Sequence, residues 1–264
     1  MSSGCSAIAF VLAACIVLDA GAQPPLRVCA DPNNLPFSNR RGQGFENRIA
    51  ALIARDLNRP LAYFWLPQRR GFIRNTLQAG RCDVVMGTPA QNARVQSTRP
   101  YYRSSYVFVT RRDRHLQIRS FDDARLKSLT IGIQVTGDDY NNPPAAQALA
   151  ARHLVQNVRG YTVYGNYFKP DPQRDVVDAV ANRRIDVAVI WGPLAGYYAR
   201  AQAVPLDVVA VRPERDGPGA VFAFDIAIGV RPEDTALRQA IDTVLVRRRG
   251  AIRRILTAYG VPLR

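Results

Sequence analysis

The chain of 264 residues is 47% hydrophobic and carries a net charge of +15. This length and apolar content can bury one large core or two modest lobes, so the protein is globular. The positive charge alone does not indicate nucleic-acid binding, because the chain has no aromatic-basic RNA motif and no helix-turn-helix pattern. A positive field also speeds encounter with an acidic protein or an anionic surface, and solubility is the alternative explanation for it.

The N-terminus predicts a secretory signal over residues 1–22. Residues 7–18 form an apolar run too short to span a bilayer, and Ala20, Gly21 and Ala22 offer a small-residue cleavage site. Residues 12–15 (LAAC) also resemble a lipoprotein box, which would leave a lipid-anchored Cys15. We prefer cleavage after Ala22, because the apolar run continues past that cysteine. No later segment is apolar for long enough to cross a membrane, so we expect an exported protein without a transmembrane segment.

Short β-rich runs alternate with helical patterns along the rest of the chain. Strands are predicted at residues 26–30, 61–66, 82–86, 106–110, 129–133, 185–190, 206–211 and 222–230. A helical stripe of apolar residues follows the first strand over 45–57, and a shorter one covers 176–180. This alternation predicts an α/β protein with parallel sheets covered on both faces.

Two polar segments divide the alternation into lobes. Residues 111–115 (RRDRH) follow one strand directly, and residues 212–219 are rich in proline, glycine and charge. Both are predicted to be crossovers between lobes. Lobe 1 then comprises residues 23–110 plus 222–264, and lobe 2 comprises residues 111–221.

Two cysteines, Cys29 and Cys82, remain after removal of the leader. Each falls in a short predicted strand, and an isolated pair usually closes in an oxidising compartment. We therefore expect a Cys29–Cys82 disulfide. The alternative is two inert buried thiols, since a parallel register can leave the Cα atoms too far apart.

An ordered series of motifs resembles the type II periplasmic solute-binding proteins over nearly the whole mature chain. The motifs are LRVCAD (26–31), LPFS (35–38), GFE (44–46), LQAG (77–80), CD (82–83), RPYY (99–102), IGIQ (131–134) and IDVA (185–188). The resemblance implies two α/β lobes joined by two hinge crossovers.

The positions that hold an amino acid in that family differ in this chain. Such a binder has a carboxylate-binding arginine two residues after the Thr-Pro that opens the helix beyond its third strand, where this chain has Gln91. It also has an ammonium-binding carboxylate shortly after its Val-Asp-Ala strand, where this chain has Trp191. An amide and an indole cannot replace two opposed charges, so the sequence argues against ordinary amino-acid capture.

Arg70 stands about where many of these proteins place an aromatic lid residue, and Arg69 precedes it. Two arginines at a helix N-terminus would favour an anion. A solvated pair at a helix start is the alternative.

The segments 31–38, 67–74, 82–87 and 191–197 together are similar to the MxaJ/XoxJ group of proteins associated with quinoprotein dehydrogenases. This resemblance implies a noncatalytic accessory role in periplasmic methanol oxidation. The implied partners are the large subunit of a dehydrogenase dependent on pyrroloquinoline quinone (PQQ) and its acidic c-type cytochrome, with calcium- and lanthanide-dependent enzymes both left open. The alternative is a receptor for a small anion, PQQ itself being one choice, or a transporter's substrate-binding protein.

The predicted cleft residues combine strand ends with the positions that depart from the family. They are Asp31, Asn33, Phe37, Arg69, Arg70, Thr88, Gln91, Tyr102, Gln134 and Trp191. Tyr102 and Trp191 follow strand ends, and open α/β sheets bind ligands at the carboxyl ends of their strands.

No catalytic or metal-ligating constellation is visible in the sequence. The only histidines, His115 and His153, have no partner at ligand spacing, and the acidic pair Asp138 and Asp139 fits a turn or a helix cap better than a calcium site. There is no haem attachment motif and no nucleophile elbow. We therefore expect a protein that is not an enzyme and holds no metal or cofactor.

Overall fold

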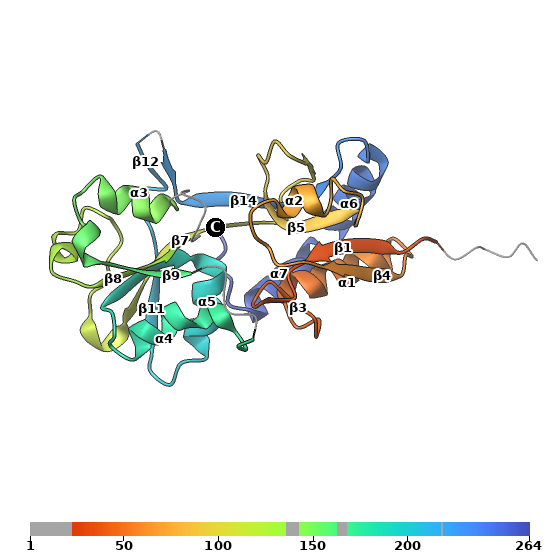
Figure 1. Ribbon diagram of the computed structural model, residues 1–264. Helices are drawn as coiled ribbons and strands as arrows, with labels where there is room; N and C mark the ends of the chain where they lie inside the picture. The colour runs from red at the N-terminus through yellow and green to blue at the C-terminus, as the bar shows by residue number, and fades with distance from the viewer. Residues whose placement is uncertain (1–22, 136–142, 163–167, 218) are drawn as a thin grey trace, which may run out of the picture.

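The computed structural model describes residues 23–135, 143–162, 168–217 and 219–264. The predicted leader, with its cleavage site at Ala22, and the pair Asp138 and Asp139 lie outside these residues. The described chain forms two α/β lobes side by side, linked by two long strands that run between them (Figure 1). The predicted two-lobed α/β architecture with two crossovers is confirmed. The crossovers are the strands at residues 102–111 and 223–230, however, and the prediction that they lie at residues 111–115 and 212–219 was wrong, because Arg111 and Arg215 already pair within the second lobe.

The first lobe is built on the strand order β4-β1-β5-β14, with β1 parallel to β4 and β5, and β14 antiparallel to β5. Its elements are β1 (Leu26–Ala30), β2 (Asn33–Asn34), β3 (Ser38–Asn39), α1 (Phe45–Asp56), β4 (Leu61–Trp65), α2 (Phe72–Asn75), β5 (Val84–Pro89), β6 (Gln96–Ser97), β14 (Ala223–Val230), α6 (Thr235–Arg247) and α7 (Arg249–Ala258).

Alternate residues of the first lobe's strands face two different cores. Val28 and Val84 pack with α1, α6 and α7 on one face of the sheet, whereas Cys29 and Val85 pack with Phe72 of α2 on the other. The period of two in a strand produces this division. The lobe is therefore three layers thick, as the predicted parallel sheet requires.

The second lobe continues the sheet in the order β7-β10-β8-β9, and β11 also pairs with β7. Its elements are β7 (Tyr102–Arg111), β8 (Ile131–Val135), α3 (Pro144–Ala150), β9 (Val158–Thr162), α4 (Asp175–Ala181), β10 (Val187–Trp191), α5 (Gly192–Arg200), β11 (Leu206–Ala210), β12 (Arg215–Asp216) and β13 (Ala220–Val221), with 3-10 turns at Arg112–Arg114, Ala124–Lys127, Val155–Asn157 and Pro172–Arg174. Val187 and Val189 of β10 face one core, and Ala188 and Ile190 face the other.

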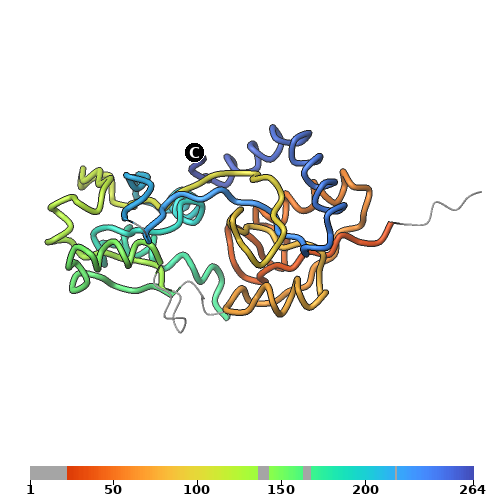
Figure 2. The backbone as a smooth tube through the Cα atoms, turned by 90° about the horizontal axis from the view of Figure 1, so that it is seen from above, coloured from red at the N-terminus to blue at the C-terminus, as the bar shows by residue number. Residues whose placement is uncertain are grey.

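Strands β7 and β14 connect the lobes. Ser105 of β7 pairs with Ala223 of β14, whereas the next residue, Tyr106, pairs with Trp191 of β10. Strand β7 thus joins the parts of one sheet that lie in the two lobes, and Figure 2 shows the two connecting strands side by side between the lobes. The division into residues 23–110 plus 222–264 and residues 111–221 stays a prediction.

The strands differ from the predicted ones mainly at their ends. Strand β7 begins at Tyr102 instead of residue 106, and β5 begins at Val84, two residues later than predicted. The edge strand β9 was missed. Residues 90–95 form turns, so the helix implied after Thr88 and Pro89 by the family resemblance is absent from this segment.

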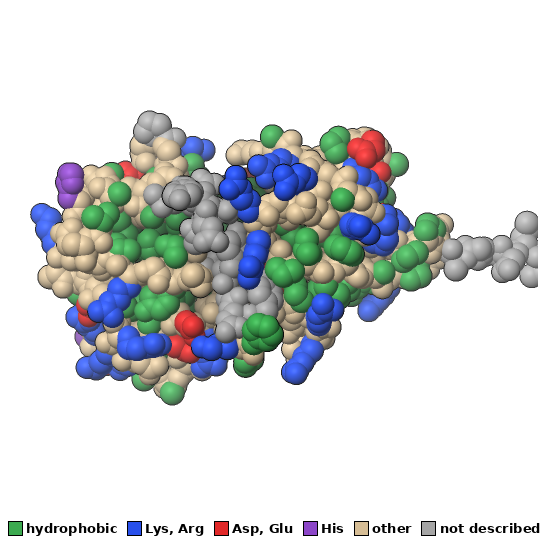
Figure 3. Space-filling view, in the orientation of Figure 1, with side chains coloured by type: hydrophobic (Ala, Val, Ile, Leu, Met, Phe, Trp, Pro, Cys, Tyr) green, Lys and Arg blue, Asp and Glu red, His purple; other side chains and the backbone are tan. Residues whose placement is uncertain are grey.

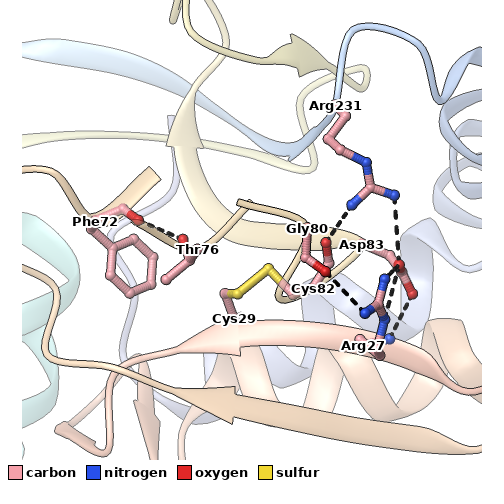
Figure 4. The surroundings of a disulfide bond; sticks show 8 residues. All are labelled: Arg27, Cys29, Phe72, Thr76, Gly80, Cys82, Asp83 and Arg231. Atoms are coloured by element: carbon pink, nitrogen blue, oxygen red, sulfur yellow. Dashed lines mark hydrogen bonds and ion pairs between the residues drawn. A yellow bond between two sulfur atoms is a disulfide. The ribbon is translucent and has the colours of Figure 1, made fainter. Parts of the chain in front are cut away.

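The predicted disulfide between Cys29 and Cys82 is confirmed, with the two Cα atoms 5.5 Å apart. Cys82 lies just before β5, beside β1, so the bond fixes the end of the segment that contains α2 (Figure 4). The next residue, Asp83, accepts hydrogen bonds from the Arg27 backbone N–H at 3.0 Å and from the Arg27 guanidinium at 2.6 Å. The α2 segment is therefore anchored to the sheet by a covalent bond and an ion pair.

Candidate functional site

A cavity of about 750 Å³ lies between the two lobes. Its walls come from the carboxyl ends of β1, β5, β8 and β10, together with the α2 segment and the two connecting strands. This is where open α/β sheets hold ligands.

Nine of the ten predicted cleft residues line this cavity. They are Asp31, Asn33, Phe37, Arg69, Arg70, Thr88, Tyr102, Gln134 and Trp191. Gln91 does not: its side chain is exposed beside a separate hollow of about 180 Å³ that Arg103 and Asp225 also line. The turn after Pro89 directs Gln91 away from the cavity.

Asp31 positions the loops at the cavity mouth. Its carboxylate accepts hydrogen bonds from the backbone N–H groups of Asn33, at 2.8 Å, and of Gln68, at 2.7 Å. One carboxylate thereby joins the loop after β1 to the segment that carries Arg69 and Arg70. Since two backbone donors already occupy Asp31, its main role here is to hold these loops.

The hinge side of the cavity is aromatic. The Trp191 ring lies 5.6 Å from that of Tyr106 and 5.9 Å from that of Phe224, both in edge-to-face contact. Burial raises the pKa of Tyr106 to about 12, so its hydroxyl stays protonated. Tyr106 packs against Phe222 of the second lobe's core and also lines the cavity. Where an amino-acid binder offers a carboxylate, this chain offers an apolar surface.

Polar groups beside this surface are already paired within the protein. The Gln134 amide oxygen accepts a hydrogen bond from the Trp191 backbone N–H at 3.3 Å. The Thr88 hydroxyl donates to the Ala227 carbonyl at 3.3 Å. These contacts fix the wall where the lobes meet.

Three arginines also line the cavity: Arg69, Arg70 and Arg94. Lys and Arg side chains gather over the α2 region on the face shown in Figure 3. The sequence did not predict Arg94. The Asn92 side chain accepts a hydrogen bond from the Arg94 backbone N–H at 3.0 Å, and this turn brings Arg94 to the cavity.

Glu46, in the first turn of α1, also lines the cavity and was not predicted. Burial raises the pKa of Glu46 to about 8, and the neighbouring Tyr101 hydroxyl opposes this rise. Gly87 makes room for the carboxylate: a Cβ atom there would lie 2.2 Å from the Glu46 Oε1 atom, and its φ of +69° suits glycine. Glu46 is therefore largely neutral at pH 7, which leaves the arginines as the dominant cavity charge.

Three hydrogen bonds connect the lobes across the cavity edge. The Asn33 side chain donates to the Lys169 carbonyl at 2.9 Å, and the Tyr198 hydroxyl donates to the Leu35 carbonyl at 3.1 Å. The Gln173 amide donates to the Asn34 side chain. All three run from the second lobe to the β2–β3 region of the first.

Within the described ranges, no three His, Cys, Asp or Glu side chains come together as a metal site would require. None of the helices in those ranges is both long enough and apolar enough to span a bilayer.

Two lobes, a hinge of two strands and a cavity at their strand ends define a two-lobed binding protein of type II. The bacterial extracellular solute-binding proteins, family 3, match residues 26–261 of this chain, and the chain belongs to this family. Within it, similarity to the proteins MoxJ, XoxJ and MxaJ makes the chain one of the MxaJ/XoxJ type.

Relatives of this type cover most of the chain. Protein MoxJ of Methylorubrum extorquens is 35% identical over 245 residues, which is 90% of this chain and 81% of MoxJ. The crystal structure of the periplasmic binding protein XoxJ from Methylobacterium extorquens AM1 is 37% identical, with a TM-score of 0.74 over 90% of this chain and 99% of XoxJ. That of MxaJ from Methlophaga aminisulfidivorans MPT is 28% identical, with a TM-score of 0.76 over 90% of this chain and all of MxaJ.

Proposed function

We propose that the protein is a noncatalytic periplasmic accessory protein of a PQQ-dependent methanol dehydrogenase, and that it binds the large subunit during assembly or activation. The MoxJ and XoxJ relatives support the link to methanol oxidation. The cavity carries the argument for a partner rather than an amino acid: Trp191 replaces the family's ammonium-binding carboxylate, and Gln91 lies outside the cavity.

The aromatic surface gives the cavity a use for a protein partner. Trp191, Tyr106 and Phe224 offer a contiguous apolar surface inside a cavity large enough for a few side chains. Buried tryptophan and tyrosine contacts dominate the energetics of many interfaces. We therefore propose that the cavity holds a segment of the dehydrogenase.

The proposed location is the periplasm, after removal of residues 1–22. The buried Cys29–Cys82 disulfide suits an oxidising compartment. The family is described as extracellular, which agrees with export.

The test is direct binding of the purified chain to purified methanol dehydrogenase, measured by surface plasmon resonance. We expect binding that weakens with salt, and a loss of at least about tenfold in affinity for Trp191→Ala, since buried interface tryptophans often contribute 2 kcal/mol or more. Trp65→Ala is the matched control, because Trp65 stacks on Tyr63 outside the cavity. No binding at low salt, or equal losses in both variants, would contradict the proposal.

The second candidate is a receptor for a small anion, with PQQ as a tricarboxylate example. Arg69, Arg70 and Arg94 in the cavity favour it, as does the neutral state of Glu46. A receptor gains stability on binding, so its melting temperature should rise with PQQ concentration. The Arg69→Ala, Arg70→Ala variant should lose that rise, and the exposed pair Arg41→Ala, Arg74→Ala should keep it. An unchanged rise in the first variant would remove these two arginines from the site.

A further inference from the structure

Helices α1 and α7 expose five arginines on the first lobe. They are Arg48 and Arg55 of α1 and Arg249, Arg253 and Arg254 of α7, and they are called the arginine face below. The apolar sides of both helices are buried in the core of the lobe. The helices hold the backbone of the arginine face rigid.

The two helices are antiparallel neighbours. At one end, Asp56 of α1 accepts hydrogen bonds at 2.8 Å from Arg247 and Arg248, which precede α7. At the other end, the Arg48 guanidinium lies 5.6 Å from the centre of the Tyr259 ring, just after α7. The exposed sides of α1 and α7 therefore form one surface.

The carboxylates of α1, α6 and α7 do not neutralise this surface. Asp56 is buried beneath Arg248 and Arg247, whose hydrogen bonds lower its pKa to about 2. Asp242 of α6 accepts from Arg238 at 2.6 Å and from the Arg99 backbone at 2.7 Å. Glu46 faces the cavity. Among the described residues, no carboxylate forms an ion pair with the arginine face.

The arrangement is unfavourable within the isolated protein. Arg249 and Arg253 are four residues apart on α7, where like charges repel, and the first turns of a helix disfavour positive charge. An external anionic surface would turn this repulsion into attraction. Arginine, rather than lysine, pairs with carboxylates through two parallel hydrogen bonds.

The buried apolar sides argue against a membrane as that anionic surface. A helix that lies in a bilayer interface needs a free apolar face, whereas Ile252 and Leu256 of α7 are each at most 2% exposed. A folded acidic surface needs no such face. The chemistry of the arginine face therefore favours an acidic protein over a lipid surface.

We infer that the arginine face docks an acidic surface of the protein partner, and this inference rests on the proposed function. Helices α6 and α7 lie along one side of the first lobe, and the α2 segment with Arg69 and Arg70 lies on the other (Figure 2). Docking through the arginine face leaves the cavity free for a second contact. Charge then provides rapid encounter, and the cavity provides the specific contact.

The test compares two charge reversals with equal change in net charge. The first is Arg249→Glu, Arg253→Glu, Arg254→Glu on the arginine face. The control is Arg159→Glu, Arg184→Glu, Arg215→Glu, three exposed arginines of the second lobe. Binding of wild type and both variants to purified methanol dehydrogenase is measured at low and physiological salt. Vesicles of phosphatidylglycerol serve as the lipid probe, and thermal unfolding verifies that each variant is folded.

We expect the face variant to bind the dehydrogenase at least about tenfold more weakly at low salt, mainly through a slower association rate, and the control to lose less than about threefold. A variant in which the same three arginines become lysine keeps the charge but loses the paired hydrogen bonds, so it should keep the association rate of wild type and dissociate faster. This variant also tests the inference if the charge-reversed variant does not fold. Equal losses in the face variant and the control would overturn the inference, as would loss of vesicle binding alone. If wild type does not bind the dehydrogenase, the proposed function itself fails; if wild type binds and the two reversals behave alike, only the docking surface fails.

Discussion

Glu46 lines the cavity, and its pKa lies close to neutral pH. Its pKa is about 8 in the folded protein against an ordinary value of 4.5. Between these values the folded chain holds a proton that the unfolded chain has released. Stability therefore falls as pH rises through this window. Below about pH 4.5 the carboxyl is protonated in both states, so Glu46 no longer lowers the stability of the folded protein.

We predict that Glu46→Gln removes this pH dependence. As pH rises from 5 to 8.5, the free energy of unfolding of the variant should increase by roughly 2–4 kcal/mol relative to wild type. This energy is smaller than the full pKa shift would give, because water in the cavity screens the partly exposed Glu46 carboxylate. Urea unfolding at several pH values measures it. The control is Glu233→Gln, whose side chain is 69% exposed, and it should follow the wild-type profile. Parallel curves for Glu46→Gln and wild type would contradict the pKa shift.

Residue spacing predicted most of the cavity lining but misplaced one part of it. Gln134 and Trp191 were found because they lie at the carboxyl ends of β8 and β10, and these ends meet at one edge of the sheet. Tyr102 also lines the cavity, but it begins β7 and does not follow a strand end, so the reason given for it was wrong. Gln91 was placed in the cleft by assuming a helix after Pro89. The Asn92 side chain instead makes a turn with the Arg94 backbone, which turns Gln91 outward and brings Arg94 in. Such a local choice between helix and turn is weakly encoded in residue type.

At the scale of elements, the runs of β-branched residues predicted the buried strands well and the exposed ones poorly. Strand β10 (VAVIW) is almost entirely buried and apolar, and its pattern is unambiguous. Strand β9 (VRGYT) lies at the sheet edge with an exposed arginine and glycine, so it has no apolar period to detect.

The disulfide should stabilise the first lobe through the α2 segment. It closes a loop with a sequence separation of 53 residues, and its removal in a Cys29→Ala, Cys82→Ala variant should cost about 2–4 kcal/mol. Urea unfolding of wild type with and without a strong reductant gives the same quantity independently. The variant should not respond to the reductant. Equal stability of the oxidised wild type and the variant would show that the bond contributes nothing.

At the scale of the whole molecule, two strands and a few side-chain contacts control how the lobes sit. Strands β7 and β14 are continuous between the lobes and can act as a hinge, since a few residues suffice to absorb such a rotation. The contacts of Asn33 and Asn34 with Lys169 and Gln173 close one edge of the cavity. If the cavity holds a partner segment, as proposed, opening of these contacts would widen its entrance.

We predict that an Asn34→Ala, Gln173→Ala variant populates a more open arrangement. The variant loses the one hydrogen bond between Gln173 and Asn34, and a side-chain hydrogen bond contributes about 1 kcal/mol, so the ratio of closed to open molecules should change by several-fold. Small-angle X-ray scattering should report a larger radius of gyration for this variant. Asn157→Ala is the control, because Asn157 donates only to the Leu126 and Lys127 carbonyls within the second lobe. If the closed arrangement depends on these contacts, the variant should also associate faster with the dehydrogenase, since less of the population must open first. An unchanged radius of gyration would contradict the predicted opening. If association with the dehydrogenase were nevertheless faster, lobe opening would not be the step that limits the association rate.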